Sequence, residues 1–98
     1  CVAPRIADGN LSVYAQYTLR VADRDALGRR LAAADIPTAL YYPVTLDGQP
    51  ALARHSRVAG PLTIAHRAAD EVISLPMHPY LREDEMQHIT DAVRDGLH

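Results

Sequence analysis

The chain has 98 residues, of which 48% are hydrophobic and 22% charged, with a formal net charge of −2. This composition is typical of one globular domain and excludes a disordered chain. The small negative charge and the lack of a basic stripe argue against a nucleic-acid-binding protein. No apolar run is long enough to span a membrane. A single cysteine excludes an internal disulfide and fits a reducing, cytoplasmic location.

The first 21 residues divide into an irregular segment and a strand. Residues 1–11 carry Pro4 and the turn-forming run Asp8-Gly9-Asn10, which predicts an entry segment or linker. Residues 12–21 alternate between two faces, which is typical of a half-buried strand. Because the first residue is not Met, we expect these residues to be part of a longer protein, with the domain proper at 12–98.

A helix and a second strand follow. Asp23 or Asp25 can cap a helix whose apolar residues recur at helical spacing up to Ala34. Pro37 ends that helix, because a proline disfavours helical backbone at the residue before it. Residues 38–42 then predict a short strand, which Pro43 stops.

The middle of the chain is predicted to be mostly irregular. Residues 44–61 contain the turn signal Asp47-Gly48, and a short helical turn is expected around 51–55. Pro61 suits the first position of a helix that extends to about Glu71.

The last third of the chain predicts a strand and a helix. The strand is Val72–Leu75, and the helix runs from Glu83 to Asp95, with acidic residues at its start and Gly96 at its end. The order β-α-β-(short α)-β-α indicates an α+β fold, a small three-stranded sheet covered on one face by helices. The other face would carry Tyr14 and one of two adjacent tyrosines, so we expect another domain to cover it.

Those adjacent tyrosines, Tyr41 and Tyr42, lie where the second predicted strand becomes a loop. Neighbouring strand residues face opposite ways, so one ring could pack in the core while the other offers its hydroxyl to a ligand. The alternative is that both are ordinary strand aromatics, one buried and one half-exposed.

The segment 74–81, Ser-Leu-Pro-Met-His-Pro-Tyr-Leu, is denser in special residues than a surface turn requires. Pro79 keeps His78 extended and so fixes where the imidazole points. A positioned donor to a phosphate, carboxylate or sugar hydroxyl would use such rigidity, whereas the alternative is an ordinary loop histidine. The histidines form no metal-binding spacing, and no glycine-rich phosphate loop is present. All ten Lys+Arg residues are arginine, so this chain holds no lysine for a Schiff base.

From Ser12 onward the chain resembles the C-terminal domain of the DegT/DnrJ/EryC1/StrS family of sugar aminotransferases, which depend on pyridoxal 5'-phosphate. The resemblance lies in the order and spacing of several motifs, namely Ser12–Tyr17, Ile36–Thr38, Tyr41–Pro43, Gln49-Pro50, Glu71-Val72 and Ser74–Leu81.

The resemblance implies a fold-type I enzyme in which a large N-terminal domain holds the Schiff-base lysine and most cofactor contacts. The complete enzyme would be a homodimer that aminates a nucleotide-linked keto-sugar with an amino-acid donor, for polysaccharide or antibiotic-sugar biosynthesis. This chain alone would be inert, without catalytic, cofactor-binding or metal-binding residues. Its substrate-binding residues would be Tyr41, Tyr42, Gln49 and His78, although His78 could be structural.

The chain departs from the family pattern in two places. In the first place, the loop has Thr45-Leu46-Asp47-Gly48 where Pro-Leu-His is usual in the family. This difference is expected to alter a loop that faces the ligand, so the identity of the sugar substrate stays open. Ala65-His66 stands where Ala-Glu is usual, on a helix, where we expect little effect. Two other readings remain: a stand-alone ligand-binding or dimerisation module, and an unrelated α+β domain such as a ferredoxin-like ligand sensor.

Overall fold

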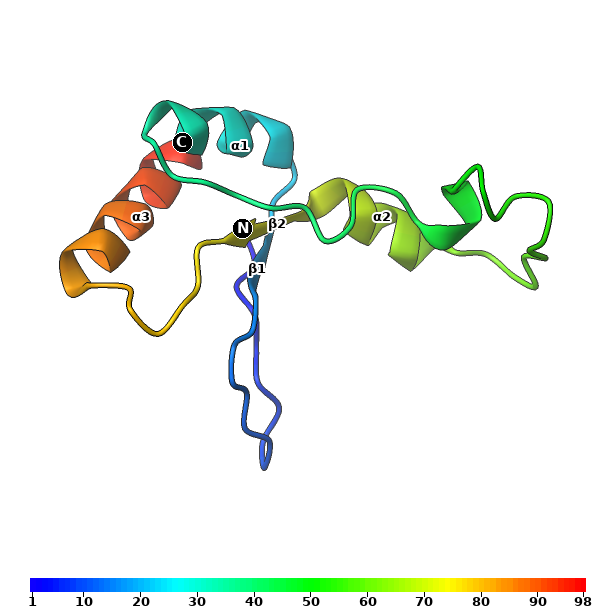
Figure 1. Cartoon of the computed structure of the whole chain (residues 1–98), viewed down its shortest axis with the longest axis horizontal. Coiled ribbons are helices and arrows are strands. Elements are labelled where there is room, and N and C mark those ends of the chain that lie inside the picture. Colours follow the sequence, from blue (N-terminus) through cyan, green and yellow to red (C-terminus); the bar gives the residue numbers. More distant parts are fainter.

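The computed structural model describes all residues from 1 to 98 (Figure 1). It has two strands, three α-helices and one 3₁₀ turn, and is therefore an α+β structure as predicted. In chain order the elements are β1 (Tyr17–Arg20), α1 (Arg24–Ala33), the turn η1 (Leu46–Gly48), α2 (Thr63–Glu71), β2 (Val72–Leu75) and α3 (Glu83–Gly96).

The two strands pair antiparallel, with Tyr17 opposite Leu75 and Arg20 opposite Val72. Helices α1 and α3 lie beside each other and to the same side of the strands (Figure 1). The only apolar core lies between the helices and the strands. Three of its side chains, those of Leu27, Leu31 and Ile73, are almost completely buried. Each contributes about 1.5–3 kcal/mol by leaving water. The core residues are Leu19, Val21, Leu27, Leu31, Ile36 and Ile73.

The structure does not confirm the predicted three-stranded sheet. Within residues 38–42, only Ala39 pairs with β2, through two hydrogen bonds to Ser74, with N···O distances of 3.1 and 2.8 Å. Prolines at positions 37 and 43 flank this segment and lack the N–H that a ladder needs. The predicted strand is therefore a single bridge, after which the chain leaves the sheet.

The first strand is also shorter than predicted. Residues 12–16 belong instead to an arm, formed by residues 1–16, that projects from the sheet (Figure 1). Tyr14 has φ = 47°, which breaks the extended alternation, and Val13 is 88% exposed. The start of the arm is tied to the sheet, because Val2 and Arg20 exchange backbone hydrogen bonds of 2.8 and 3.0 Å.

Helix boundaries largely follow the predictions. Asp23 caps α1, since its carboxylate accepts a hydrogen bond from the Ala26 N–H at 3.0 Å. Helix α2 begins two residues later than Pro61. Around residues 51–55 the chain forms consecutive hydrogen-bonded turns but no regular helix, with a helical bond from the Ala53 N–H to Gln49 O at 3.1 Å. The single 3₁₀ turn lies earlier, at Leu46–Gly48.

The molecule measures 48 × 36 × 23 Å, and only 8 of its 98 residues are buried. Two parts extend away from the core, the arm of residues 1–16 and the region around α2 (Figure 1). Both expose apolar side chains, including Leu11 and Ile64 at 95% and 86%. Such surface is typical of a protein that packs against something else. None of the helices has the length and apolar character needed to cross a membrane.

Candidate functional site

Tyr41 and Tyr42 lie just after the Ala39 bridge, at the start of the loop that leads to Gln49. The peptide bond between them is cis. Their rings are 5.7 Å apart between centroids and meet edge to face, with an interplanar angle of 74°. Tyr41 is 44% exposed and Tyr42 is 71% exposed. Neither ring enters the core, so the expectation that one of the two would be buried there is wrong.

A hollow of about 670 Å³ separates this loop from helix α2. The loop contributes Tyr41, Tyr42 and Gln49 to its wall, and the helix side contributes mostly small apolar residues. Three of the four residues singled out from the sequence therefore surround one space. The lining residues contributed from the helix side are Leu62, Ala65, Ala68, Ala69 and Val72.

One side-chain contact joins the loop to α2 at the edge of this hollow. His66 Nε2 lies 2.9 Å from Asp47 Oδ2. The pKa of the Asp47 carboxyl is lowered, with the Thr45 hydroxyl as the largest influence and His66 as a further one, while partial burial opposes them. The two residues lie 19 positions apart, in the two segments where the chain departs from the family pattern that it resembles.

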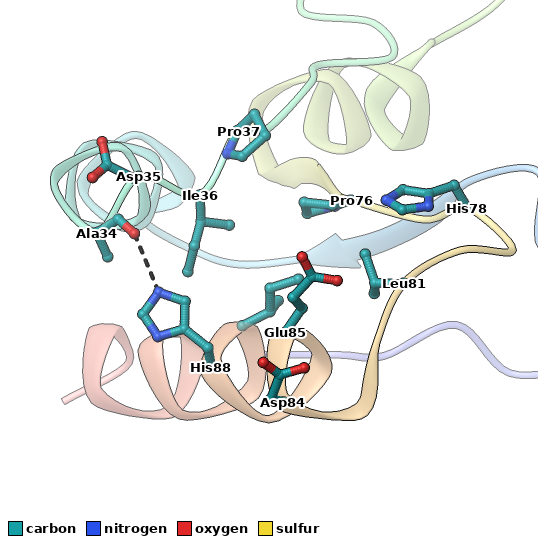
Figure 2. Close-up of a pocket in the computed structure, with 11 residues that line it drawn as sticks. Ala34, Asp35, Ile36, Pro37, Pro76, His78, Leu81, Asp84, Glu85 and His88 are labelled. Atoms are coloured by element: carbon teal, nitrogen blue, oxygen red, sulfur yellow. Dashed lines mark hydrogen bonds between the residues drawn. The ribbon is translucent and has the colours of Figure 1, made fainter.

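His78 faces a different hollow, of about 460 Å³, between the end of α1 and the start of α3 (Figure 2). Its other polar walls are Asp35, Asp84, Glu85 and His88. The His88 ring donates to the Ala34 carbonyl oxygen at 3.2 Å, which links α3 to the end of α1 (Figure 2). The structure thus separates His78 from the two tyrosines.

A third hollow, of about 310 Å³, lies between these two and connects them through shared walls. Tyr41 belongs both to it and to the hollow beside α2, while Pro37 and Pro76 belong both to it and to the hollow around His78. The candidate residues therefore line three neighbouring depressions that share wall residues. Within residues 1–98, no three His, Cys, Asp or Glu side chains gather in an arrangement that could hold a metal ion.

Comparison with known proteins identifies the family. The model of the DegT/DnrJ/EryC1/StrS aminotransferase family matches residues 2–94. The chain belongs to this family. The resemblance drawn from the sequence motifs is confirmed.

Several curated relatives are named as sugar aminotransferases. The chain is 47% identical over 90 residues to the UDP-2-acetamido-2-deoxy-3-oxo-D-glucuronate aminotransferase of Pseudomonas aeruginosa, covering 92% of this chain and 24% of that one. It is 35% identical over 95 residues to a UDP-N-acetyl-3-dehydro-α-D-glucosamine 3-aminotransferase of Acidithiobacillus ferrooxidans, covering 97% and 25%. The chain thus spans about a quarter of the length of the curated relatives it matches.

Solved structures agree on the fold. A DegT/DnrJ/EryC1/StrS aminotransferase from Brucella abortus superposes with a TM-score of 0.88 at 35% identity, over 95% of this chain and 25% of that one. Streptomyces venezuelae DesV, in complex with a ketimine intermediate, gives 0.88 at 34% identity, over the same shares. The fold is therefore that of part of a fold-type I aminotransferase.

Enzymes of this family generally use pyridoxal phosphate, but this chain's residues do not fit the cofactor. The Schiff base needs a lysine amine, and the chain contains none. No step that involves the cofactor can therefore be assigned to a residue of this chain.

Proposed function

We propose that this chain is the C-terminal domain of an enzyme that transfers an amino group from an amino acid to the keto carbon of a nucleotide-linked sugar. The observation that carries the proposal is the 47% identity to an aminotransferase whose name specifies a UDP-linked 3-oxo sugar. The stand-alone binding module considered above has no specific observation in its favour.

Within that enzyme, this chain supplies a wall of the substrate cleft. A nucleotide sugar offers flat rings and many hydroxyls, which aromatic faces and amide groups bind well. Tyr42 is the most exposed aromatic residue of the hollow beside α2, and Gln49 can both donate and accept hydrogen bonds there. Tyr41 joins this hollow to the next, and His78 offers a ring N–H to a more distant part of the substrate.

The rest of the enzyme supplies what this chain lacks. A large N-terminal domain provides the lysine and holds pyridoxal phosphate, and a second copy completes a homodimer. These partners cover the apolar surface of the arm and of the region around α2, since isolated domains rarely expose so much. The complete enzyme works in the cytoplasm, in the biosynthesis of a polysaccharide or antibiotic sugar.

The role of Tyr42 can be tested in a joined protein, in which this chain replaces the matching quarter of the Pseudomonas aeruginosa relative. We expect Tyr42→Ala to raise the KM for the nucleotide sugar about tenfold, the effect of losing roughly 1.4 kcal/mol of binding. Absorbance of the bound cofactor should not change. Tyr80→Ala is the matched control, because Tyr80 is 86% exposed and lies in none of the three hollows. Equal kinetics for the two variants would refute the role of Tyr42.

A further inference from the structure

The contact between Asp47 and His66 joins the loop that carries the candidate substrate residues to helix α2. We propose that this pair positions the loop from Tyr41 to Gln49 against α2 and so sets the shape of the sugar-nucleotide hollow. This inference rests on the proposed function and adds two positioning residues to it.

The loop side of the pair is rigidly connected to Gln49. Asp47 is the central residue of the turn η1, which is closed by hydrogen bonds from the Gly48 N–H to Thr45 O, 3.0 Å, and from the Gln49 N–H to Leu46 O, 3.2 Å. The carboxylate that meets His66 is therefore one short turn from the Gln49 side chain. Any shift of Asp47 relative to α2 moves Gln49 with it.

The helix side of the pair is fixed to the sheet. Glu71, the last residue of α2, accepts hydrogen bonds from Arg67 at 2.7 Å and from Arg20 of β1 at 2.6 and 3.1 Å. A continuous series of contacts thus runs from β1 through Glu71 and α2 to His66. The loop has no other hydrogen bond to α2 among those formed in residues 1–98.

The Asp47 carboxylate of this pair is largely shielded from water. The Asp47 side chain is 20% exposed, against 54% for His66, and its Oδ1 is buried without a hydrogen-bond partner of good geometry. A carboxylate in such surroundings is costly unless its other oxygen is well satisfied. His66 provides that partner.

The two departures from the family pattern support this interaction. Both residues lie in the two segments where the chain departs from the motifs that it resembles, one in the loop and one on α2. Their side chains are chemically complementary, since a carboxylate oxygen can accept a hydrogen bond from an imidazole N–H.

The test uses the joined protein described above and four variants. These are His66→Ala, Asp47→Ala, the exchange variant Asp47→His/His66→Glu, and His55→Ala as a control, an exposed histidine without a side-chain hydrogen bond. We expect each of the two single alanine variants at the pair to raise the KM for the nucleotide sugar about two- to fivefold, the range of a partly exposed ion pair. Both kcat and the cofactor spectrum should stay unchanged.

Recovery of the KM in the exchange variant distinguishes a loss of loop positioning from a general loss of structure. The exchange variant should return KM to within about twofold of the unsubstituted protein, since it restores an acid–imidazole pair. Hydrogen–deuterium exchange of a peptide covering residues 44–50 should be faster in the single variants and normal in the exchange variant. The control should match the unsubstituted protein in every measurement.

Several results would overturn the proposal. It is wrong if the single variants keep the original KM, or if the exchange variant behaves no better than they do. If the unsubstituted joined protein folds and binds cofactor but aminates no nucleotide sugar, the proposed function fails, while hydrogen exchange still decides whether the pair holds the loop. If this joined protein does not fold, the same variants are made in a second one, in which the chain replaces the matching quarter of the Acidithiobacillus ferrooxidans relative, and hydrogen exchange there decides the same point.

Discussion

At the scale of single residues, the Glu71 carboxylate connects helix α2 to strand β1. It accepts hydrogen bonds from Arg67 within α2 and from Arg20 on β1. Arg67 is the larger influence and Arg20 the second, and together they hold the pKa of the Glu71 carboxyl below its usual value of 4.5. The helix that carries His66 is thereby attached to the sheet by an ionised group.

This attachment should depend on pH. Because the folded state lowers the pKa of Glu71, its contribution to stability is present above about pH 4.5 and is lost as the pH falls below that value. We expect Glu71→Gln to lower the melting temperature at pH 7 and to have a smaller effect at pH 3. Melting curves of the 98-residue chain followed by circular dichroism at both pH values measure this. An equal effect at both would contradict the assigned role.

Residue-scale features differed in how far the sequence could predict them. Tyr41, Tyr42 and Gln49 were singled out because they lie close together along the chain and match a family motif, and the structure places them around one hollow. The pair Asp47–His66 was missed because the two residues are 19 positions apart, and their contact depends on the path of an irregular loop. The sequence did hold a clue, because the residues at the two departures from the family motifs are an acid and an imidazole, which can form a hydrogen bond with each other.

At the scale of elements, the packing of α1 on α3 fixes the core. Leu27 and Leu31 are 1% and 0% exposed, and Gly96 of α3 lies directly against Leu27. A Cβ added at Gly96 would come within 2.6 Å of Leu27 Cδ1. The buried leucine has little room to turn away, so the glycine permits the two helices to approach.

Gly96→Ala should therefore destabilise the chain. Overpacking costs more than the alanine gains in helix propensity, which leaves a net loss of about 1–2 kcal/mol. Gly60→Ala is the control, because nothing lies within 4 Å of an added Cβ there. Urea unfolding of both variants measures the difference. If Gly96→Ala is as stable as the control, the close approach of the two helices is not as described.

Helices were predicted better than strands, for a physical reason. Helical spacing of apolar residues is a local signal. Asp23 and the acidic residues at the start of α3 also indicate, to within one turn, where each helix begins. A strand forms only if a partner lies alongside, and residues 38–42 pair at Ala39 alone. Alternation in residues 12–16 was likewise misleading, because those residues lie in the projecting arm instead of the sheet.

At the scale of the whole molecule, the chain is more extended than a self-sufficient domain. Its radius of gyration is 15.7 Å, whereas a compact domain of this length has about 13 Å. The core holds α1, α3 and both strands together, and the two projecting parts lack a core of their own. The sequence predicted an open sheet face that carries Tyr14, but Tyr14 lies in the projecting arm and not in the sheet. The two projections were not predicted, because nothing in the local sequence pattern specifies the path of a segment that lacks a core of its own.

Trypsin should distinguish these parts in the isolated chain. Without lysine, it cuts only after arginine. We expect the first cuts after Arg5, Arg54 and Arg57, which are exposed in the projecting segments, and later cuts after Arg20 and Arg24, which hold contacts around the strands. Mass spectrometry of a time course identifies the order. Early cleavage after Arg24 would show that the core does not fold on its own.

The most direct test of the account is catalysis by the joined protein, in which this chain replaces the matching quarter of the Pseudomonas aeruginosa relative. We predict that the joined protein aminates UDP-2-acetamido-2-deoxy-3-oxo-D-glucuronate within about tenfold of the relative's own rate, a difference of about 1.4 kcal/mol in activation free energy. A joined protein that folds and binds pyridoxal phosphate, yet aminates neither this substrate nor any other nucleotide-linked keto-sugar, would contradict it.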